Sequence, residues 1–256
     1  MATNPQHRTW VKICHWIVTL AFIGLLFTGI EILMVHPRLY WGEVGNDLTP
    51  ALFELPISRN YKHGGFTEGQ PFFQTPGSPV SAGRTYDIFN QNGWGRSLHF
   101  LAGWFLVVSG LIYLLLGIFG GHFRKNIFLS KKEFKWSSIM NDLKDHLRLL
   151  IPRASGGPDY GILQKISYTI VIFIALPLMV ITGFTMAPAI TAAFPFLLDL
   201  FGGYQSARTI HFFSTIALLL FFIIHIVMVI LSGFKKQILA MTFKRPYEKE
   251  TDRNPS

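Results

Sequence analysis

Four long runs of apolar residues dominate the pattern of hydrophobic and polar positions along the chain. They cover residues 13–35, 98–119, 167–187 and 210–232. Each run has the length of about 20 residues that a helix needs to cross the hydrocarbon core of a bilayer. The runs are continuous and lack the alternation of apolar and polar positions that membrane strands show. The pattern therefore predicts an all-α fold, an integral membrane four-helix bundle that forms a single domain over residues 1–256.

Polar segments separate and follow these runs. Residues 36–97 are rich in Gly, Pro, Asn and Ser, which predicts a long loop between the first two helices. Because this segment also contains many aromatic residues, we expect a folded cap or a docking surface. Within residues 120–166, apolar side chains recur at helical spacing from Trp136 to Leu150, which predicts an amphipathic helix lying in the membrane interface. Residues 233–256 form a polar tail.

Composition and charge agree with a membrane protein and orient it. Half of the residues are hydrophobic, 14% are charged and the mean hydropathy is +0.36, which is too apolar for a soluble domain of this length. Of the 23 Lys and Arg residues, 17 lie before the first run, between the second and third runs, or after the fourth. Since cytoplasmic segments carry the excess of Lys and Arg, we expect both termini in the cytoplasm. The net charge of +9 then reflects membrane topology and contact with lipid, and we expect no nucleic-acid partner.

Four histidines lie inside the predicted spans or at their first turn: His15, His99, His211 and His225. Ionisable residues are rare at such positions and mark functional sites. Successive helices run in opposite directions, so His15 and His225 are expected at the cytoplasmic level, and His99 and His211 at the outer level. His211 and His225 are 14 residues apart, which is close to four whole turns and about 21 Å of axial rise. Both therefore project from one face of the fourth helix, and each meets a histidine of another helix at its own depth.

Two histidine pairs predict two b-type haems, one near each membrane surface. Bis-histidine ligation fills both axial positions of a haem iron and favours electron transfer over oxygen activation. Cys14 is the only cysteine, so the Cys-x-x-Cys-His motif of covalent haem attachment is absent and the haems are expected to be bound non-covalently. A single histidine here has a simpler interpretation as a hydrogen-bonded interfacial residue, but four at two matched depths favour ligation.

The other histidines are predicted to be surface or interfacial residues: His7, His36, His63, His122 and His146. For His122 we keep a second interpretation, contact with the inner haem or with a quinone.

A basic residue stands three positions before three of the four histidines in the spans. These basic residues are Arg96, Arg208 and Lys12. Three residues is nearly one helical turn toward the nearer membrane surface, where the propionates of a haem point toward water, so the three cations are candidate propionate partners. The alternative, which the sequence leaves open, is that they are ordinary basic residues reaching from helix ends into the interface.

These motifs resemble those of the bacterial di-haem cytochrome b family, the membrane subunits of nickel–iron hydrogenases, formate dehydrogenases and thiosulfate reductases. The resemblance rests on Cys14-His15-Trp16 in a helix that ends with Thr28-Gly29, on Arg96-Ser97-Leu98-His99-Phe100, and on Arg208-Thr209-Ile210-His211 followed by His225. It implies a subunit of the bacterial cytoplasmic membrane that links a dehydrogenase or reductase, often periplasmic, to the quinone pool. The chain departs from shorter members of the family in its long segment 36–97, which leaves the identity of the partner open.

The leading functional hypothesis is transmembrane electron transfer for a separate catalytic subunit, an oxidoreductase containing iron–sulfur or molybdenum. The chain itself has no nucleotide-binding glycine motif, no cysteine cluster and no catalytic triad, so we name no catalytic residue. The alternative is a stand-alone quinone-coupled oxidoreductase that accepts electrons from a small outer donor such as superoxide.

A quinone is expected to meet the inner haem if the partner docks outside. Gln164, Lys165 and Tyr168 begin the third helix at that level and have polar groups for a quinone carbonyl or for proton transfer. The alternative is that they simply form the interfacial start of a helix.

Overall fold

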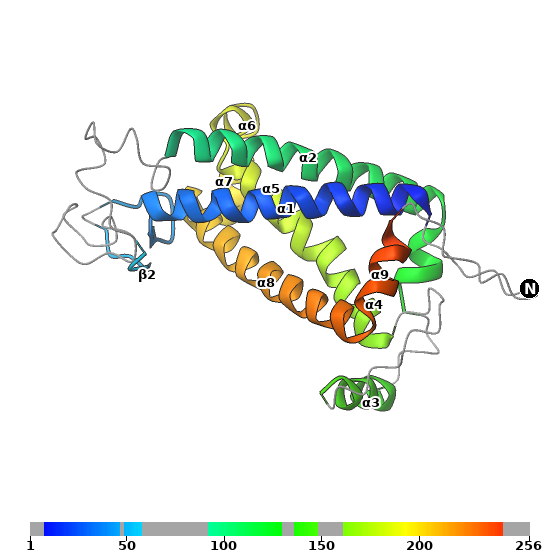
Figure 1. The fold of residues 1–256 in the computed structure, drawn as a ribbon. Coiled ribbons are helices and arrows are strands. Elements are labelled where there is room, and N and C mark those ends of the chain that lie inside the picture. Colours follow the sequence, from blue (N-terminus) through cyan, green and yellow to red (C-terminus); the bar gives the residue numbers. More distant parts are fainter. Residues whose placement is uncertain (1–7, 47–48, 58–91, 130–135, 148–160, 243–256) are drawn as a thin grey trace, which may run out of the picture. The chain divides into compact units, whose positions relative to one another are not determined.

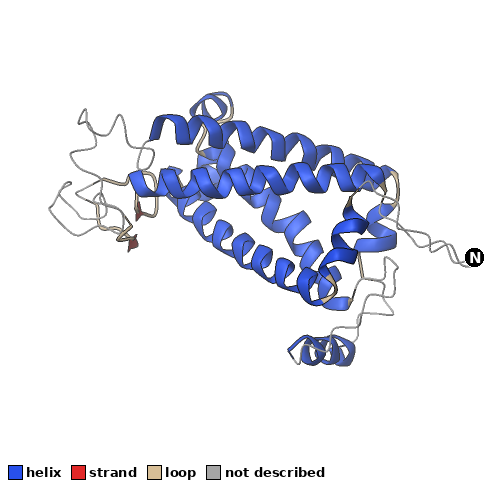
Figure 2. Ribbon diagram, in the orientation of Figure 1, coloured by secondary structure: helices blue, strands red, loops and turns tan. Residues whose placement is uncertain are grey.

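The computed structural model describes five stretches of the chain, and most of their residues are helical (Figures 1 and 2). The described residues are 8–46, 49–57, 92–129, 136–147 and 161–242. Most of the predicted segment 36–97 and of the tail 233–256 lies outside them. The all-α fold is confirmed for the part of the chain that the structure describes.

The elements follow one another along the chain as a few long helices with short elements between them (Figure 1). In chain order they are α1 (Thr9–Val35), β1 (Arg38–Leu39), β2 (Phe53–Glu54), α2 (Asn92–Phe119), the π-helix η3 (Phe123–Ile127), α3 (Trp136–Leu147), α4 (Ile162–Ile170), the π-helix η4 (Val171–Ala175), α5 (Leu176–Thr185), α6 (Pro188–Ala193), α7 (Phe196–Phe201), α8 (Tyr204–Leu231) and α9 (Phe234–Met241). Strands β1 and β2 pair antiparallel, with Arg38 opposite Glu54.

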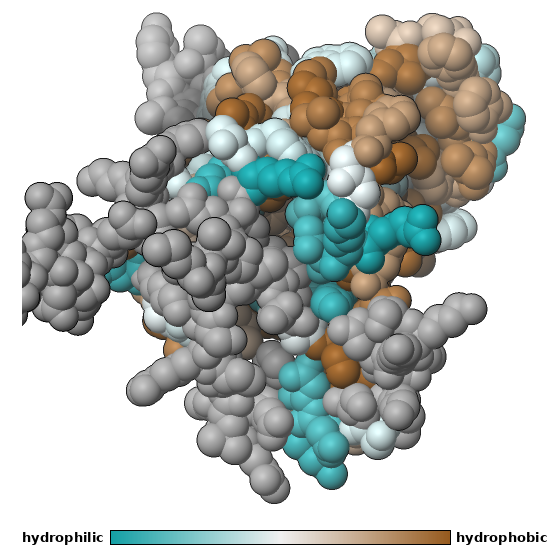
Figure 3. Space-filling model, turned by 90° about the vertical axis from the view of Figure 1, so that its right-hand side faces the viewer, coloured by the Kyte–Doolittle hydropathy of each residue, from teal (hydrophilic) through white to brown (hydrophobic). Residues whose placement is uncertain are grey.

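Four helices in the described residues are long and apolar enough to cross a membrane. They cover Thr9–Val35, Gly93–Phe119, Ile162–Thr185 and Tyr204–Leu231. At most 22% of the most apolar window of any of them is buried inside the protein. Figure 3 shows hydrophobic side chains exposed on one face. Because water penalises exposed apolar surface of this extent, these faces belong in lipid, and the prediction of four membrane spans is confirmed.

The observed helices begin four to six residues earlier than the apolar runs, at Thr9, Asn92, Ile162 and Tyr204. Hydropathy locates the part of a helix that crosses hydrocarbon, whereas the hydrogen-bonded helix continues through polar residues into the interface. The third span ends earlier than predicted, at Thr185.

Proline explains that early end. Ala187 has an extended backbone conformation (φ −95°, ψ 108°) and Pro188 starts the short helix α6. The residue before a proline is disfavoured in the α conformation, because the proline ring clashes with its backbone. The short helices α6, α7 and α9 were not predicted from the sequence, whereas the predicted helix that starts at Trp136 is present as α3.

The chain divides into two compact units. Unit 1 comprises Met1–Trp16, Ile112–Thr169 and Phe221–Ser256; unit 2 comprises Ile17–Leu111 and Ile170–Leu220. In unit 2, side chains of α1 and α2, of α5 and α8, and of α2 and α8 are in contact. In unit 1, side chains of α1 and α8, of α1 and α2, and of α4 and α8 are in contact. All four spans therefore pack together within each unit.

In unit 2, the segment after α1 caps the start of α8. The carbonyl of Gly42 accepts hydrogen bonds from the backbone N–H groups of Gln205 (2.9 Å) and Ser206 (3.2 Å). The Glu43 carboxylate accepts a hydrogen bond from the N–H of Tyr204 (3.1 Å). The first N–H groups of a helix have no partner inside the helix, and a negative charge beside them is favourable. These contacts therefore fix both the start of α8 and the course of the segment that lies over it.

Candidate functional site

Two pairs of histidines face each other with nearly the same geometry. In unit 2, the rings of His99 and His211 have centroids 6.4 Å apart and an interplanar angle of 58°. In unit 1, the rings of His15 and His225 have centroids 6.4 Å apart and an interplanar angle of 55°. The structure thus brings together the histidines that the sequence analysis paired by their expected depth in the membrane. The two histidines of each pair come from different helices.

This separation is the one that a single metal ion between two imidazoles requires. Two metal–nitrogen bonds of about 2.0–2.1 Å and two ring radii of roughly 1.1 Å add up to about 6.3 Å between centroids. Among the described residues, no group of three or more His, Cys, Asp or Glu side chains gathers as a protein-only metal site would need. Two facing imidazoles instead suit a metal that brings its remaining four ligands in a macrocycle, as haem iron does.

Each histidine of the unit 2 pair is held by a threonine of another helix. Thr28 Oγ1 of α1 lies 2.9 Å from His99 Nδ1, and Thr182 Oγ1 of α5 lies 2.9 Å from His211 Nδ1. Both threonines are completely buried. With Nδ1 engaged in this way, Nε2 is the nitrogen of each ring that is placed to ligate iron.

A glycine follows each of these threonines and lies against the same ring. A Cβ atom added to Gly29 would lie 3.7 Å from His99 Cε1, and one added to Gly183 would lie 3.6 Å from His211 Cε1. These are ordinary van der Waals distances, so the imidazole alone does not exclude an alanine. The glycines keep the helix surface flat beside the edge of the ring that carries Nε2, where a planar macrocycle needs close approach.

The unit 1 pair is surrounded by aromatic rings. Phe221 stacks on His225 with centroids 5.9 Å apart at 18°, and Tyr168 meets the same ring edge-on at 6.5 Å. The neighbouring Trp16 donates its indole N–H to the carbonyl of Met241 (2.9 Å) at the end of α9. The short helix α9 therefore helps to hold the part of α1 that carries His15.

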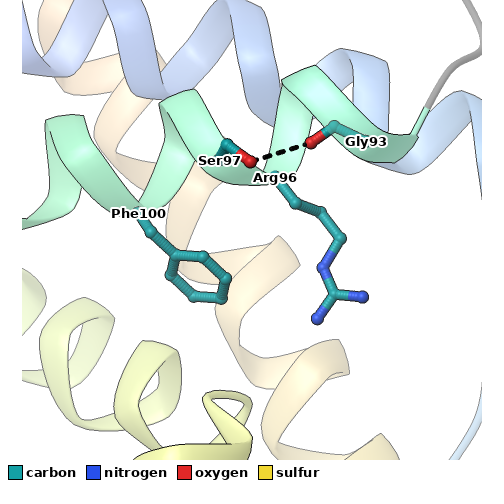
Figure 4. A pocket seen from close by; sticks show the side chains of 4 residues that line it. All are labelled: Gly93, Arg96, Ser97 and Phe100. Atoms are coloured by element: carbon teal, nitrogen blue, oxygen red, sulfur yellow. Dashed lines mark hydrogen bonds between the residues drawn. The ribbon is translucent and has the colours of Figure 1, made fainter.

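The three predicted propionate partners have different environments. Arg96 is exposed, with its guanidinium 6.0 Å from the centroid of the Phe100 ring, and it lines an open pocket of about 330 Å³ with Gly93 and Ser97 (Figure 4). Lys12 is buried and its ammonium donates to the carbonyl of Thr242 (2.9 Å).

Arg208 binds the backbone of the segment that follows α1. Its guanidinium donates to the carbonyls of Arg38 (3.0 Å) and His36. One residue further along α8, the Thr209 hydroxyl donates to the carbonyl of Tyr40 (2.6 Å). Arg208 therefore has a structural partner that the sequence did not suggest, and its role toward a propionate remains a prediction.

A cluster of arginines surrounds His36 in unit 2. The pKa of His36 is lowered to about 4, first by desolvation and then by the positive charges of Arg208, Arg96 and Arg38. The side chain is partly solvent-exposed, but protein atoms crowd its ring closely enough for desolvation to be the largest cause. Three cations near one neutral histidine create a strongly positive region, which suits anionic groups such as propionates.

Two of the three predicted quinone residues are in direct contact. The Gln164 side-chain amide donates to the Tyr168 hydroxyl (3.0 Å). Lys165 lies on the same helix, and its backbone N–H bonds to the carbonyl of Gly161 (3.0 Å). Tyr168 thus lies between Gln164 and the ring of His225.

The prediction that His122 is a surface or interfacial residue was wrong. Its side chain is only 7% exposed and its Nδ1 lies 2.9 Å from the amide nitrogen of Asn126. The rings of Trp10 and Tyr113 pack against it at 5.4 Å and 6.1 Å. Burial follows because η3 folds back immediately after α2, a turn that hydropathy does not reveal.

Sequence reasoning missed Thr28 and Thr182 as functional residues, although a signal for them exists. The dipeptide Thr-Gly occurs in the first and in the third span, at Thr28-Gly29 and Thr182-Gly183. Each copy contacts the histidine that ends an Arg-x-x-His motif in the next span. Comparing the two halves of the chain position by position would have found the pair.

The chain is similar to known proteins over most of its length. A family model described as prokaryotic cytochrome b561 matches residues 6–244. A relative from Azospira oryzae is 27% identical over 225 residues, which cover 88% of this chain and 90% of the relative. That relative carries the name of a protein-methionine-sulfoxide reductase subunit, YedZ1. No solved structure matches the chain significantly.

The arginine cluster leads to a prediction about His36. Replacing Arg208 by Gln removes the positive charge that lowers the pKa of His36 most, so this pKa should rise from about 4 toward its ordinary value of 6.5. The rise should be incomplete, because desolvation remains. Titration of the His36 ring by NMR in protein labelled at histidine measures the change.

Arg96→Gln should give a rise as well and tests the same charge effect without disturbing the backbone contacts of Arg208. Arg124→Gln, in unit 1, is the control and should leave the titration unchanged. If neither Arg208→Gln nor Arg96→Gln changes the titration of His36, the arginines do not set the pKa of His36.

Proposed function

This chain belongs to the prokaryotic cytochrome b561 family, and on that premise we propose that it holds two non-covalent haems, linking a partner oxidoreductase to the membrane quinone pool. Membership makes it an integral membrane protein of electron transfer that binds haem b. His99 and His211 ligate one haem, and His15 and His225 ligate the other. The observation that carries the proposal is the equal centroid separation of 6.4 Å in the two pairs.

The chain's residues determine what such haems can do. When bound, each haem would supply an iron that exchanges one electron, and ligation by two histidines would leave that iron without a position for oxygen or substrate. Both pairs include a residue of α8, and His211 and His225 are 14 residues apart on it. At about 1.5 Å per residue the two ligands lie about 21 Å apart along the helix, most of the thickness of a hydrocarbon core. The arrangement therefore supports electron transfer from one membrane surface toward the other.

The distribution of charge supports an orientation with both termini in the cytoplasm. By this proposal, His15 and His225 lie near the cytoplasmic surface of a bacterial inner membrane, and His99 and His211 lie near the outer surface. The observation behind it is that 17 of the 23 basic residues flank the cytoplasmic ends of the proposed spans.

The propionates of the two haems would pair with cations near each pair. Near His99 and His211 we assign them to the region of Arg96 and Arg208, because the positive charges around His36 favour anions there. Near His15 we assign them to Lys12, whose ammonium has three donors and uses one for Thr242.

Substitution of the histidines tests the ligand assignment. Wild-type protein should contain two haems per chain with low-spin bis-histidine spectra. His99→Ala and His211→Ala should each remove the same haem, and His15→Ala and His225→Ala should each remove the other. Pyridine haemochrome analysis and EPR of the purified variants measure the count and the identity of the remaining haem.

His122→Ala is a matched control, because His122 is buried but lies outside both pairs. This variant should keep both haems. Loss of different haems from His99→Ala and His211→Ala would refute the pairing.

A separate catalytic subunit is the proposed partner. The relative from Azospira oryzae carries the name of a reductase subunit, and the sequence of this chain contains neither a nucleotide-binding glycine motif nor a cysteine cluster. We propose an oxidoreductase with molybdenum or iron–sulfur centres on the outer side. The alternative is a chain that works alone, with a small outer donor such as superoxide reducing the haem at His99 and His211.

Purification from native membranes separates these two functions. Tagged chain should recover a second subunit in a one-to-one ratio, and that subunit should reduce or oxidise both haems. Chain recovered alone, with haems that superoxide reduces rapidly, would instead establish the stand-alone function. The His99→Ala variant is the control, since it should still recover the partner but should not exchange electrons with it.

The quinone site is proposed beside the haem of His15 and His225. Tyr168 supports this assignment, because its ring lies 6.5 Å from that of His225 and its hydroxyl is hydrogen-bonded to Gln164. A phenol both donates and accepts hydrogen bonds and an amide donates them, so the pair suits the two states of a quinone carbonyl. Lys165 is assigned the relay of protons from the cytoplasm.

Changes at this pair should slow quinone-linked turnover and leave the haems in place. Tyr168→Phe and the double change Gln164→Ala with Lys165→Ala should each slow the oxidation of the haems by a quinone analogue. The rate should fall about tenfold, which corresponds to the loss of one or two hydrogen bonds. Tyr204→Phe, at the start of α8 in unit 2, is the control. Unchanged rates, together with a quinone analogue bound beside His99, would place the quinone at the other haem.

A further inference from the structure

The two threonines that bind the unit 2 histidines act as hydrogen-bond acceptors, and their other contacts show why. Thr28 Oγ1 donates to the carbonyl of Gly24 at 2.7 Å, and Thr182 Oγ1 donates to the carbonyl of Leu178 at 2.7 Å. A hydroxyl has one hydrogen to donate. Because each hydrogen is directed to the threonine's own helix, each oxygen can accept the Nδ1–H of the histidine, which it shares with the backbone carbonyl of Leu25 at His99 and of Met179 at His211.

This direction fixes the state of both rings. A neutral imidazole carries one hydrogen, and when Nδ1 holds it, Nε2 carries the lone pair. Both histidines are thereby prepared as Nε2 ligands by a contact that is buried and identical on the two sides of the site. The threonine distances are both 2.9 Å, and both threonines have no exposed surface.

The two threonines belong to matching halves of the chain. In each half, a Thr-Gly pair lies on the first helix and an Arg-x-x-His motif on the second. The match continues along the helices. His15 precedes Thr28 by 13 residues and Tyr168 precedes Thr182 by 14, and the π-helix η4 between Tyr168 and Thr182 accommodates the extra residue.

We propose that Thr28 and Thr182 are positioning residues that lower the midpoint potential of the haem held by His99 and His211. This inference rests on the proposed haem ligation. An acceptor on Nδ1–H raises the basicity of a metal-bound imidazole. A more basic ligand stabilises ferric over ferrous iron, so two such acceptors, one on each axial ligand, shift the haem toward the oxidised state.

Isosteric replacement tests the proposal in the full-length protein with its haems bound. Thr28→Val and Thr182→Val should each raise the potential of the haem at His99 and His211, because each removes one acceptor. At fixed potential the ratio of reduced to oxidised haem should increase by up to about fivefold for each change, which at 59 mV per tenfold change is about 40 mV. The double variant should give roughly the sum, since the two threonines act on opposite ligands.

Three comparisons separate this effect from a general packing change. The haem at His15 and His225 is an internal control, and its potential should not move. Thr185→Val, a completely buried threonine of the same helix α5 whose hydroxyl donates to the Ile181 carbonyl (2.9 Å), should leave both potentials unchanged. Thr28→Ser and Thr182→Ser keep the hydroxyl and should restore the wild-type potential.

Redox titration followed by optical spectra and by EPR measures both haems in one sample. The EPR signal of the ferric haem at His99 and His211 should shift in the valine variants, because the ligand field weakens. If a valine variant loses this haem, the cysteine variant, whose thiol is a weak acceptor, is titrated in its place and should show a smaller rise. An unchanged potential at His99 and His211, or equal shifts at both haems, overturns the proposal. A haem count that does not depend on His99 and His211 would instead overturn the proposed function.

Discussion

The need to hold two imidazole rings a fixed distance apart, from different helices, is the constraint on which the rest of this protein depends. Histidines are costly in hydrocarbon, and a metal held between the two rings of each pair would reduce this cost. Each pair has a centroid separation of 6.4 Å. A shift of one residue along a helix turns its side chain by about 100°, so the proposed ligation would fix the rotation of α1, α2 and α8. The proposed haems would therefore be part of the packing as well as of the function.

The two sites differ in how the halves of the chain contribute. His99 and His211 occupy equivalent positions, each with its own Thr-Gly support. His15 and His225 do not, because one comes from the first helix of the first half and the other from the second helix of the second half. By its spacing, Tyr113 is equivalent to His225, because it follows His99 by 14 residues. Tyr168 is equivalent to His15.

The presence of tyrosine instead of histidine at these two positions has a chemical consequence. A phenol is a poor ligand for a low-spin haem but a good hydrogen-bond partner, so only one haem is expected at this level. Tyr168 lies against His225, where a hydroxyl can serve an exchangeable quinone. A duplicated pair of helices can thus supply two equivalent ligands at one depth and divide its roles between metal binding and substrate binding at the other.

Much of this architecture was predictable from the sequence. Four apolar runs predict four spans, and the 14-residue interval in α8 predicts two ligands on one face, because both follow from fixed helix geometry. The hydrogen bonds from Thr28 and Thr182 were not predicted, since they depend on which neighbouring helix faces each histidine. The backbone role of Arg208 was missed for a related reason. Its partners are carbonyls of residues 36 and 38, and main-chain groups leave no mark in a sequence pattern. The burial of His122 depends on the turn into η3, which the apolar pattern does not encode.

The contacts of Arg208 also connect the polar segment after α1 with the proposed haem ligand His211. Arg208 binds the carbonyls of His36 and Arg38, and Thr209 binds that of Tyr40. His211 lies less than one turn further along the same helix. A displacement of residues 36–40 would therefore break the hydrogen bonds that hold this turn of α8, and it would move positive charge relative to the haem. Since a nearby cation favours the reduced, less positive state of an iron centre, the position of this segment would influence the potential of the proposed haem.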